Sequence, residues 1–319
     1  MLRSFLISLS KAAWAQRLVT GWKFAWRAAS RFVAGNSIQE ALLVVRELNA
    51  KGMNVTLDHL GESTTTREDA IRATEDILEL LDQIERAVAR ANVSVKLTQI
   101  GLALDEKLCT QNLERILTRA GQYRNFVRID MEDTPYTDRN IQLYWQMRTK
   151  GYNHTGLVIQ SYLFRSEKDI QELLPEGTRI RLVKGAYNEP PELAFPKKAD
   201  VDSNFDLLAQ RLVEAACAAG SPNLSADGRI PPIPALGTHD QKRIQFAKNY
   251  ATRLSLPKQA LEFQMLYGIR RDLQSQCIRE GYPMRVYVPY GTHWYPYFMR
   301  RLAERPANIW FFVSNFFRK

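Results

Sequence analysis

Cysteine is scarce in this chain of 319 residues, and its distribution excludes several classes of protein. The three cysteines, Cys109, Cys217 and Cys277, form no CxxC pair and have no histidine close by in the sequence. An odd number of widely spaced cysteines argues against a disulfide scaffold, a zinc ribbon and a thioredoxin-type site. We therefore expect core thiols in a cytoplasmic protein.

Several motifs of familiar chemistries are also missing. The sequence has no GxGxxG, no Walker A loop, no HExxH and no GxSxG. A Rossmann cofactor site, P-loop hydrolysis, zinc proteolysis and nucleophile-elbow chemistry therefore lack support. The four histidines are scattered without the spacing of metal ligands, so we expect no metal site.

Long apolar runs are missing too. No segment reaches the roughly 18 uninterrupted apolar residues of a membrane span, and the N-terminus lacks the pattern of a signal peptide. The formal charge of +10 would suit a nucleic-acid binder, but residues 1–39 contribute +6 without any acid, and residues 300–319 contribute +4. The long segment between them is neutral in sum, so nucleic acid is not the expected partner.

The first segment, residues 1–31, has the pattern of a basic amphipathic helix. At about 100° per residue, apolar and basic residues fall on opposite faces, with Trp14, Leu18, Trp22, Ala25 and Ala29 against Lys23, Arg27 and Arg31. Two interpretations stay open. The helix is either docked on the domain with its basic face in solvent, or it places the protein peripherally on the inner face of an anionic membrane. An acid-free, arginine-containing start also resembles an organelle transit peptide.

Short apolar runs typical of strands alternate with helical segments through residues 32–319. Eight runs predict strands, at 54–60, 93–98, 126–131, 157–163, 179–183, 233–236, 261–265 and 284–288. Residues 67–90 and 205–219 show helical periodicity. Eight such units without a break in composition predict an α/β fold, a (β/α)8 TIM barrel in one domain.

Two connections are longer and rich in proline. Residues 188–202 follow the fifth strand, on the side where barrels build active sites, so they are either a lid or a tolerated surface loop. Residues 221–232 precede the sixth strand.

The predicted strand ends are unusually polar. They carry acids, bases and amides that include Asp58, Lys96, Asp130, Gln160, Arg181, Lys184, Thr238, His239, Gln264 and Tyr287. Burying unpartnered charges in a barrel would cost several kcal/mol each. The carboxyl ends of barrel strands surround one opening, so these residues predict a ligand site more than a structural ion-pair network.

The last predicted helix adds a second set of polar residues. Helical spacing places Tyr297, Arg300 or Arg301, and Glu304 on one face. Two arginines can bind both oxygens of a carboxylate. Alone, the pattern is more typical of an exposed ion pair between Arg300 and Glu304.

These segments together resemble the proline dehydrogenase family. The similarity runs in order from about residue 31 to residue 308. Its motifs are DHLGE at 58–62, SVKL at 94–97, RIDME at 128–132, QSYL at 160–163, RLVKGAY at 181–187, TH at 238–239, FQMLYG at 263–268, RVYVPYG at 285–291 and RRxxE at 300–304. The length resembles the short monofunctional bacterial form.

The resemblance implies a distorted barrel that binds FAD, with extra N-terminal helices and the last helix lying over the barrel mouth. It implies that the catalytic residues are Asp130 and Arg181, the latter beside the flavin. The implied substrate-binding residues are Lys96, Leu266, Tyr287, Tyr297, Arg300, Arg301, Glu304 and Glu62. The implied cofactor-binding residues are Met131, Gln160, Arg181, Lys184, Gly185, Ala186, Thr238 and His239.

The implied reaction oxidises L-proline to 1-pyrroline-5-carboxylate by hydride transfer to FAD and passes the electrons to a quinone. A Δ1-pyrroline-5-carboxylate dehydrogenase would then act downstream. A cation beside the flavin would stabilise the charge that reduction creates. Two other hypotheses stay open: a barrel lyase or aldolase that forms a Schiff base through Lys96 or Lys184, and a basic protein that binds membrane or nucleic acid.

Overall fold

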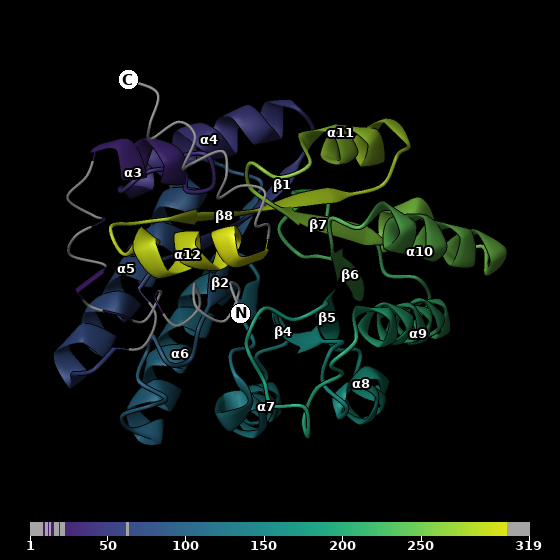
Figure 1. Ribbon diagram of the computed structural model, residues 1–319, viewed down its shortest axis with the longest axis horizontal. Coiled ribbons are helices and arrows are strands. Elements are labelled where there is room, and N and C mark those ends of the chain that lie inside the picture. The colour runs from purple at the N-terminus through teal and green to yellow at the C-terminus, as the bar shows by residue number, and fades with distance from the viewer. Residues whose placement is uncertain are drawn as a thin grey trace.

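Eight parallel strands close into a barrel in which each strand pairs with its neighbours in the sequence and β8 pairs with β1 (Figure 1). The computed structural model describes Leu9, Ala12, Trp14, Ala15, Val19, and residues 23–61 and 64–304. The strands are β1 (Asn54–His59), β2 (Ala91–Val95), β3 (Val127–Ile129), β4 (Thr155–Gln160), β5 (Arg179–Val183), β6 (Pro234–Gly237), β7 (Glu262–Leu266) and β8 (Met284–Tyr290). The predicted (β/α)8 barrel is confirmed.

Helices surround this barrel. They are α3 (Lys23–Ala29), α4 (Ile38–Ala50), α5 (Arg67–Arg86), α6 (Glu106–Gln122), α7 (Thr134–Thr149), α8 (Ser166–Leu173), α9 (Lys198–Ala218), α10 (Gln241–Arg253), α11 (Arg271–Arg279) and α12 (Trp294–Glu304), with short 3-10 helices η1 (Leu174–Glu176) and η2 (Lys258–Ala260). The largest apolar core lies between the strands and these helices.

The predicted element bounds need small corrections with local causes. The fifth strand keeps its predicted bounds, whereas the others differ at an end by at most three residues. β2 ends before Thr98 because the Thr98 amide donates to the Glu132 carboxylate at 3.1 Å and not to a neighbouring strand. The helix predicted at 67–90 ends at Arg86, since the chain reverses at Val88, where φ is +49°. The helix predicted at 205–219 begins earlier, at Lys198.

The interior of the barrel is polar below the site. Thr56, Asn92, Arg128, Glu262 and Arg285 are each at most 1% exposed. The Thr56 hydroxyl donates to the Asn92 side-chain oxygen at 2.6 Å. Branched apolar residues usually fill this space in the fold. The interior therefore depends on hydrogen bonds and ion pairs, because buried polar groups without partners would be costly.

The connection at 221–232 closes the amino-terminal end of the barrel. Arg285 Nη2 donates to the Gly228 carbonyl oxygen at 2.7 Å, and Asn92 Nδ2 donates to the Arg229 carbonyl oxygen at 2.8 Å. A Cβ at Gly228, whose φ is +71°, would lie 2.2 Å from Asn54 Oδ1. This loop therefore packs as a floor, at the opposite end of the barrel from the strand ends that were predicted to form the site.

The connection predicted as a lid is held at several points. Because α9 begins at Lys198, the connection is shorter than predicted. The Glu189 carboxylate accepts from the Thr134 amide at 2.9 Å at the start of α7, and the Phe195 amide donates to the Tyr162 carbonyl oxygen at 2.7 Å. The rings of Phe164 and Phe195 pack edge to face at 4.6 Å. These contacts place the loop against the barrel, and a lid movement stays a prediction.

The N-terminal helix α3 packs on α12, which lies across the barrel mouth (Figure 1). Ala25 and Ala29 are buried in the contact, and the rings of Trp26 and Trp294 lie 5.7 Å apart. Arg27 is exposed on the other side. In α3 the predicted apolar face is therefore docked on the protein, whereas Trp14, on the same predicted face, is 67% exposed. The side chains of Trp22 and Lys23 lie outside the described residues, as does Leu18.

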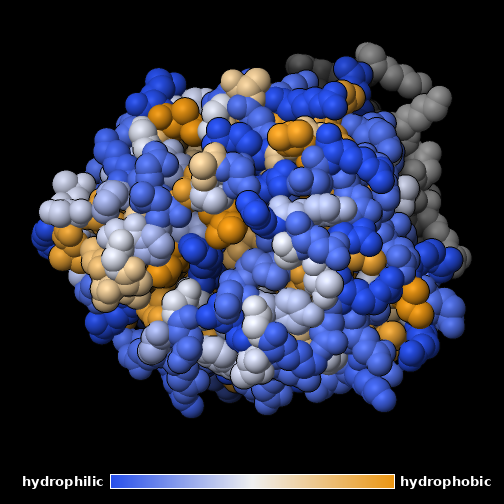
Figure 2. Space-filling view, turned by 180° about the vertical axis from the view of Figure 1, so that it is seen from behind, coloured by the Kyte–Doolittle hydropathy of each residue, from blue (hydrophilic) through white to orange (hydrophobic). Residues whose placement is uncertain are grey.

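The surface is mainly hydrophilic where Figure 2 shows it, and the hydrophobic side chains there form small, separate groups. Among the described residues, no helix is long and apolar enough to cross a membrane. The same part of the chain contains no cluster of three or more histidine, cysteine, aspartate or glutamate side chains able to hold a metal ion.

Candidate active site

A cavity of about 590 Å³ lies at the carboxyl ends of the strands, beneath α12. That volume suits a small-molecule or cofactor site. Its walls include fifteen of the predicted site residues: Lys96, Asp130, Met131, Gln160, Arg181, Lys184, Gly185, Ala186, Thr238, His239, Leu266, Tyr287, Tyr297, Arg300 and Arg301. Glu62 and the side chain of Glu304 lie outside what the structure describes.

The cavity also includes residues to which the resemblance assigned no role. They are Asp58, Val158, Val183, Tyr187, Lys198, Gly237, Asp240, Gln264 and Met265. Asp58 and Gln264 are polar residues at predicted strand ends, so the sequence did indicate a ligand site at both positions. The sequence could not show which side chain each would bind.

Asp58 and Lys96 form a buried ion pair on one side of the cavity. Lys96 Nζ lies 2.8 Å from Asp58 Oδ1 and 3.0 Å from Asp58 Oδ2, and the two residues are 5% and 1% exposed. Burial raises the pKa of Asp58 above its ordinary value, an effect that the Lys96 ammonium opposes. The resemblance assigned Lys96 to the substrate but gave its carboxylate partner no role. The structure identifies that partner as Asp58.

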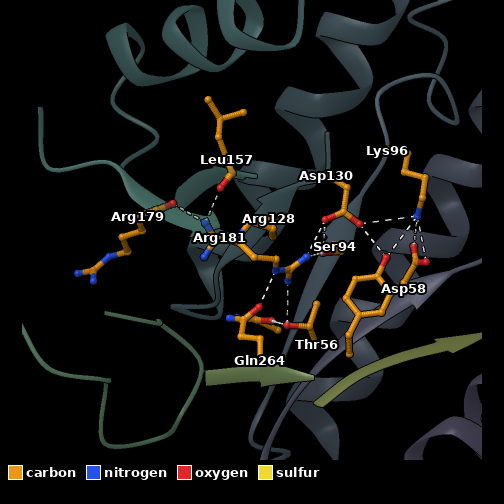
Figure 3. A network of polar contacts seen from close by, with 12 residues as sticks. Thr56, Asp58, Ser94, Lys96, Arg128, Asp130, Leu157, Arg179, Arg181 and Gln264 are labelled. Atoms are coloured by element: carbon orange, nitrogen blue, oxygen red, sulfur yellow. Dashed lines mark hydrogen bonds and ion pairs between the residues drawn. The ribbon is translucent and has the colours of Figure 1, made fainter. Parts of the chain in front are cut away.

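Asp130 connects Arg181 to Lys96 and Tyr287 (Figure 3). Its Oδ1 accepts from Arg181 Nη1 at 2.8 Å and from the Ser94 hydroxyl at 2.9 Å, while its Oδ2 accepts from the Tyr287 hydroxyl at 2.7 Å. Lys96 Nζ lies 3.7 Å from the same Oδ2. A carboxylate with this many donors is fixed in position.

Tyr287 keeps its proton in this environment. Burial, reinforced by the nearby carboxylates of Asp130 and Asp58, raises the pKa of Tyr287 well above its ordinary value. The hydroxyl is therefore a hydrogen-bond donor to Asp130, and its ring lies 5.2 Å from the Arg181 guanidinium carbon. Tyr287 thus forms part of the wall and part of the polar network.

Arg181 is held from three directions. Its Nε donates to Gln264 Oε1 at 2.5 Å, its Nη1 donates to Asp130, and its Nη2 lies 3.5 Å from the Thr56 hydroxyl oxygen. The side chain is 5% exposed and lines the cavity. Because two of these bonds fix the guanidinium plane, the cation has a defined orientation toward the open space.

The helix α12 contributes cations from above. Arg300, Arg301 and Tyr297 line the cavity, and the Arg301 guanidinium carbon lies 5.1 Å from the centre of the Tyr297 ring. The helical spacing predicted one of the two arginines beside Tyr297, and both of them line the cavity with it. With Lys96 on the opposite wall, the cavity suits a bound carboxylate.

A second part of the cavity lies over β5 and β6. Lys184 forms ion pairs with Asp202 and Asp240, the latter at 2.7 Å. His239 Nε2 accepts from the Leu266 amide at 2.9 Å, so its proton is on Nδ1. Gly185, with φ of +120°, has no room for a side chain, because a Cβ there would lie 2.3 Å from the Tyr162 ring.

The residues present fit a flavin cofactor. The Gln160 amide and the Arg181 cation offer a polar contact and a positive charge along one cavity, which the Gly185 backbone also lines. A flavin needs these features for its ring and for the charge that it gains on reduction. The site thus defines a barrel oxidoreductase that acts on a small carboxylate.

Comparison with known proteins places the chain within this class. A family profile described as Proline dehydrogenase matches residues 41–313. The chain belongs to the proline dehydrogenase family. It is 38% identical to proline dehydrogenase 2 of Bacillus subtilis strain 168 over 99% of both chains, and 40% identical to a proline dehydrogenase of Deinococcus radiodurans over 91% of this chain and 90% of that protein.

A solved structure agrees with the fold. The crystal structure of proline utilization A from Bdellovibrio bacteriovorus, inactivated by N-propargylglycine, has a TM-score of 0.79 and 28% identity. The match covers 92% of this chain and 34% of that larger chain. This chain therefore corresponds to about a third of that protein.

Proposed function

We propose that this protein oxidises L-proline to 1-pyrroline-5-carboxylate, with bound FAD as the hydride acceptor and a quinone as the final electron acceptor. Family membership supports the oxidation of proline. The observation that carries the proposal at the level of this chain is the single cavity that joins Arg181 and Asp130 to the cations of α12. When bound, FAD supplies the hydride-accepting atom.

The α12 cations would orient the substrate. Arg300 and Arg301 can donate to both oxygens of the proline carboxylate, while Lys96 adds charge from the opposite wall. Leu266, Tyr287 and Tyr297 would enclose the ring, so the carbon that loses the hydride is held in one place. We assign Glu62 and Glu304 to pairing with this cationic group.

Asp130 and Arg181 would prepare the site for charge transfer. Arg181 places a fixed cation where negative charge develops, and Asp130 keeps that cation oriented through its 2.8 Å bond. Met131, Gln160, Lys184, Gly185, Ala186, Thr238 and His239 would hold the cofactor. Tyr287 donates from its hydroxyl to Asp130, and burial raises the pKa of Tyr287, so a phenolate base for the substrate amine is disfavoured.

The structure weakens the Schiff-base hypothesis. Lys96 lies 2.8 Å from Asp58, and Lys184 forms ion pairs with Asp202 and Asp240. A lysine that attacks a carbonyl group must be a neutral amine, whereas these contacts stabilise ammonium ions. These ion pairs therefore favour the oxidation hypothesis over the Schiff-base hypothesis.

The proposed product and electrons need further partners. We propose that a Δ1-pyrroline-5-carboxylate dehydrogenase consumes the product, and that the exposed basic side of α3 brings the enzyme to a membrane that contains the quinone. Arg27 on that side is exposed. The wild type should bind anionic vesicles more tightly than a variant that lacks residues 1–31. Equal binding would remove the membrane role and leave the oxidation untouched.

The central test is anaerobic reduction of the bound flavin by proline. Proline should bleach the flavin absorbance near ~450 nm, and added quinone should restore it. Arg300→Ala should lower kcat/KM by at least roughly tenfold, because a charged hydrogen bond contributes ~1.5–3 kcal/mol. Arg253→Ala, an exposed arginine at the end of α10, is the matched control. Failure of proline to bleach the wild-type flavin would refute the proposed function.

A further inference from the structure

A buried ion pair lies beneath Arg181, outside the cavity. Glu262 of β7 and Arg285 of β8 are 0% and 1% exposed. Arg285 Nε lies 2.9 Å from Glu262 Oε1, and Arg285 Nη2 lies 3.0 Å from Glu262 Oε2. Arg285 also donates to the carbonyl oxygens of Val55 and Gly228, at 2.9 and 2.7 Å. These bonds fix the Glu262 carboxylate in one position.

Gln264 connects this pair to Arg181, and Figure 3 shows the side chain of Gln264 beside that of Arg181. Its Nε2 donates to Glu262 Oε1 at 2.5 Å, and its Oε1 accepts from Arg181 Nε at 2.5 Å. A carboxylate can only accept hydrogen bonds, so Glu262 must receive the amino end of the Gln264 amide. The carbonyl end is then left for Arg181.

We propose that Glu262, held by Arg285, is a positioning residue that fixes the Gln264 amide and thereby aims Arg181 during hydride transfer. The inference rests on the proposed function, because it concerns the same cation. Without a carboxylate at position 262 the amide can rotate and present its amino group to the Arg181 guanidinium, which also only donates. Arg181 would then lose one of the two strong bonds that define its plane.

Loss of the Glu262 carboxylate should affect the flavin and not the binding of the proline carboxylate. Glu262 and Arg285 contact neither Lys96 nor the cations of α12 in any bond described above. Binding of the proline carboxylate should therefore persist, whereas the flavin loses a well-oriented positive charge. A displacement of about 1 Å in a catalytic group can cost roughly 100-fold in rate. We expect kcat to fall roughly 10- to 100-fold while KM for proline stays within about threefold.

Two variants test the inference. Glu262→Gln keeps the shape of the side chain but removes its charge. The double variant Glu262→Met/Arg285→Met replaces the whole ion pair by apolar side chains of similar size, a change that buried ion pairs often tolerate without loss of stability. The double variant still removes the acceptor for Gln264 Nε2, so it separates positioning from folding.

The matched control is the ion pair between Lys248 of α10 and Glu280, whose atoms lie 2.6 Å apart outside the barrel interior. Lys248→Met/Glu280→Met removes a pair that makes no contact with Gln264. For all variants we would measure kcat, KM, the reduction potential of the bound flavin and the dissociation constant of FAD.

We expect a lower flavin potential and a lower kcat in the double variant, with near-normal KM and FAD binding, and smaller changes in Glu262→Gln, whose side-chain carbonyl oxygen can still accept from Gln264 Nε2. Normal potential and kcat in the folded double variant would overturn the inference, as would an equal loss in the Lys248/Glu280 control. If Glu262→Gln does not fold, the double variant decides. Wild-type flavin that proline cannot reduce would instead refute the proposed function, before any variant is compared.

Discussion

Asp130 shows at the scale of one residue how the site depends on shared hydrogen bonds. Ser94, Arg181 and Tyr287 all donate to this carboxylate, and the residue is 8% exposed. Removing one donor leaves the others in place but changes where the carboxylate lies. Single substitutions around Asp130 should therefore change rates more than they change stability.

Tyr287→Phe tests this directly. The variant keeps the ring beside Arg181 but removes the hydroxyl that donates to Asp130 at 2.7 Å. A hydrogen bond to a charged group is worth ~1.5–3 kcal/mol, so kcat/KM for proline should fall roughly 10- to 100-fold. Steady-state kinetics would measure it, with Tyr250→Phe, on the outer helix α10, as the control. Wild-type kcat/KM in Tyr287→Phe would contradict the role given to this hydroxyl.

Asp206 of α9 should make stability depend on pH. Burial raises its pKa to about 6, although the Arg243 guanidinium lies 3.0 Å away and opposes the shift. The folded protein thus holds this proton more tightly than the unfolded chain, whose ordinary aspartate pKa is near 4. The contribution of Asp206 is favourable below about pH 4 and is lost as the pH rises toward about 6.

Asp206→Asn removes that titration. The free energy of unfolding of the wild type, relative to that of Asp206→Asn, should fall between pH 4 and pH 6 and then stay level. Urea unfolding of both proteins at several pH values would measure the difference. A difference that does not change with pH would show that Asp206 titrates normally in the folded state.

The sequence predicted site residues well when they stand at strand ends. Lys96, Asp130, Gln160 and Arg181 follow apolar runs, and parallel strands bring their carboxyl ends together. Partners could not be predicted, because the pairing of Asp58 with Lys96 depends on the distance between side chains of neighbouring strands. The role of Glu262 could not be predicted for another reason. Glu262 lies inside an apolar run and not at the end of a strand.

The contact between α3 and α12 is the main feature at the scale of elements. Amphipathicity predicted a helix in residues 1–31, the segment that contains α3, but left its apolar face without a known partner. The structure supplies α12 as that partner, through Ala25, Ala29 and the tryptophan pair. Composition could not reveal this, because α3 and α12 lie at opposite ends of the sequence.

Trp26→Ala should loosen α12 and with it the α12 cations. Loss of the ring beside Trp294 should cost about 1–3 kcal/mol of unfolding free energy for a partly buried tryptophan, below the ~3–5 kcal/mol of a core site. KM for proline should rise several-fold, since Arg300 and Arg301 lie on that helix. Arg27→Ala, which removes an exposed neighbour, is the control. Unchanged KM and stability in Trp26→Ala would show that α12 is held without α3.

At the scale of the whole molecule, an apolar layer between strands and helices surrounds a barrel whose interior is polar. The predicted alternation of strands and helices yields the apolar layer between strands and helices. The polar interior could not be predicted from periodicity alone, because a strand with both faces buried shows no alternation of polar and apolar residues. Burial lowers the pKa of Arg128 well below its ordinary value, with Arg181 adding to the effect, so charge inside the barrel is costly.

Cofactor removal should therefore lower the stability of the entire domain. The cavity is lined by most of the strands as well as α12, so a ligand there contacts elements from the whole barrel. FAD at about 100 times its dissociation constant should add ~2.7 kcal/mol to the free energy of unfolding. Calorimetry of the FAD-free and FAD-loaded protein would measure the change. Equal melting temperatures would place FAD binding elsewhere or show that it is weak.

The ion pair between Glu262 and Arg285 should limit which substitutions related sequences accept at these two positions. Loss of either member alone leaves a buried charge, at a cost of ~3–5 kcal/mol, so the intermediate with one substitution should be eliminated by selection. Related sequences should thus keep both residues or replace both. Lineages that replaced the pair should also differ at position 264, because that amide would no longer have a carboxylate to select its orientation.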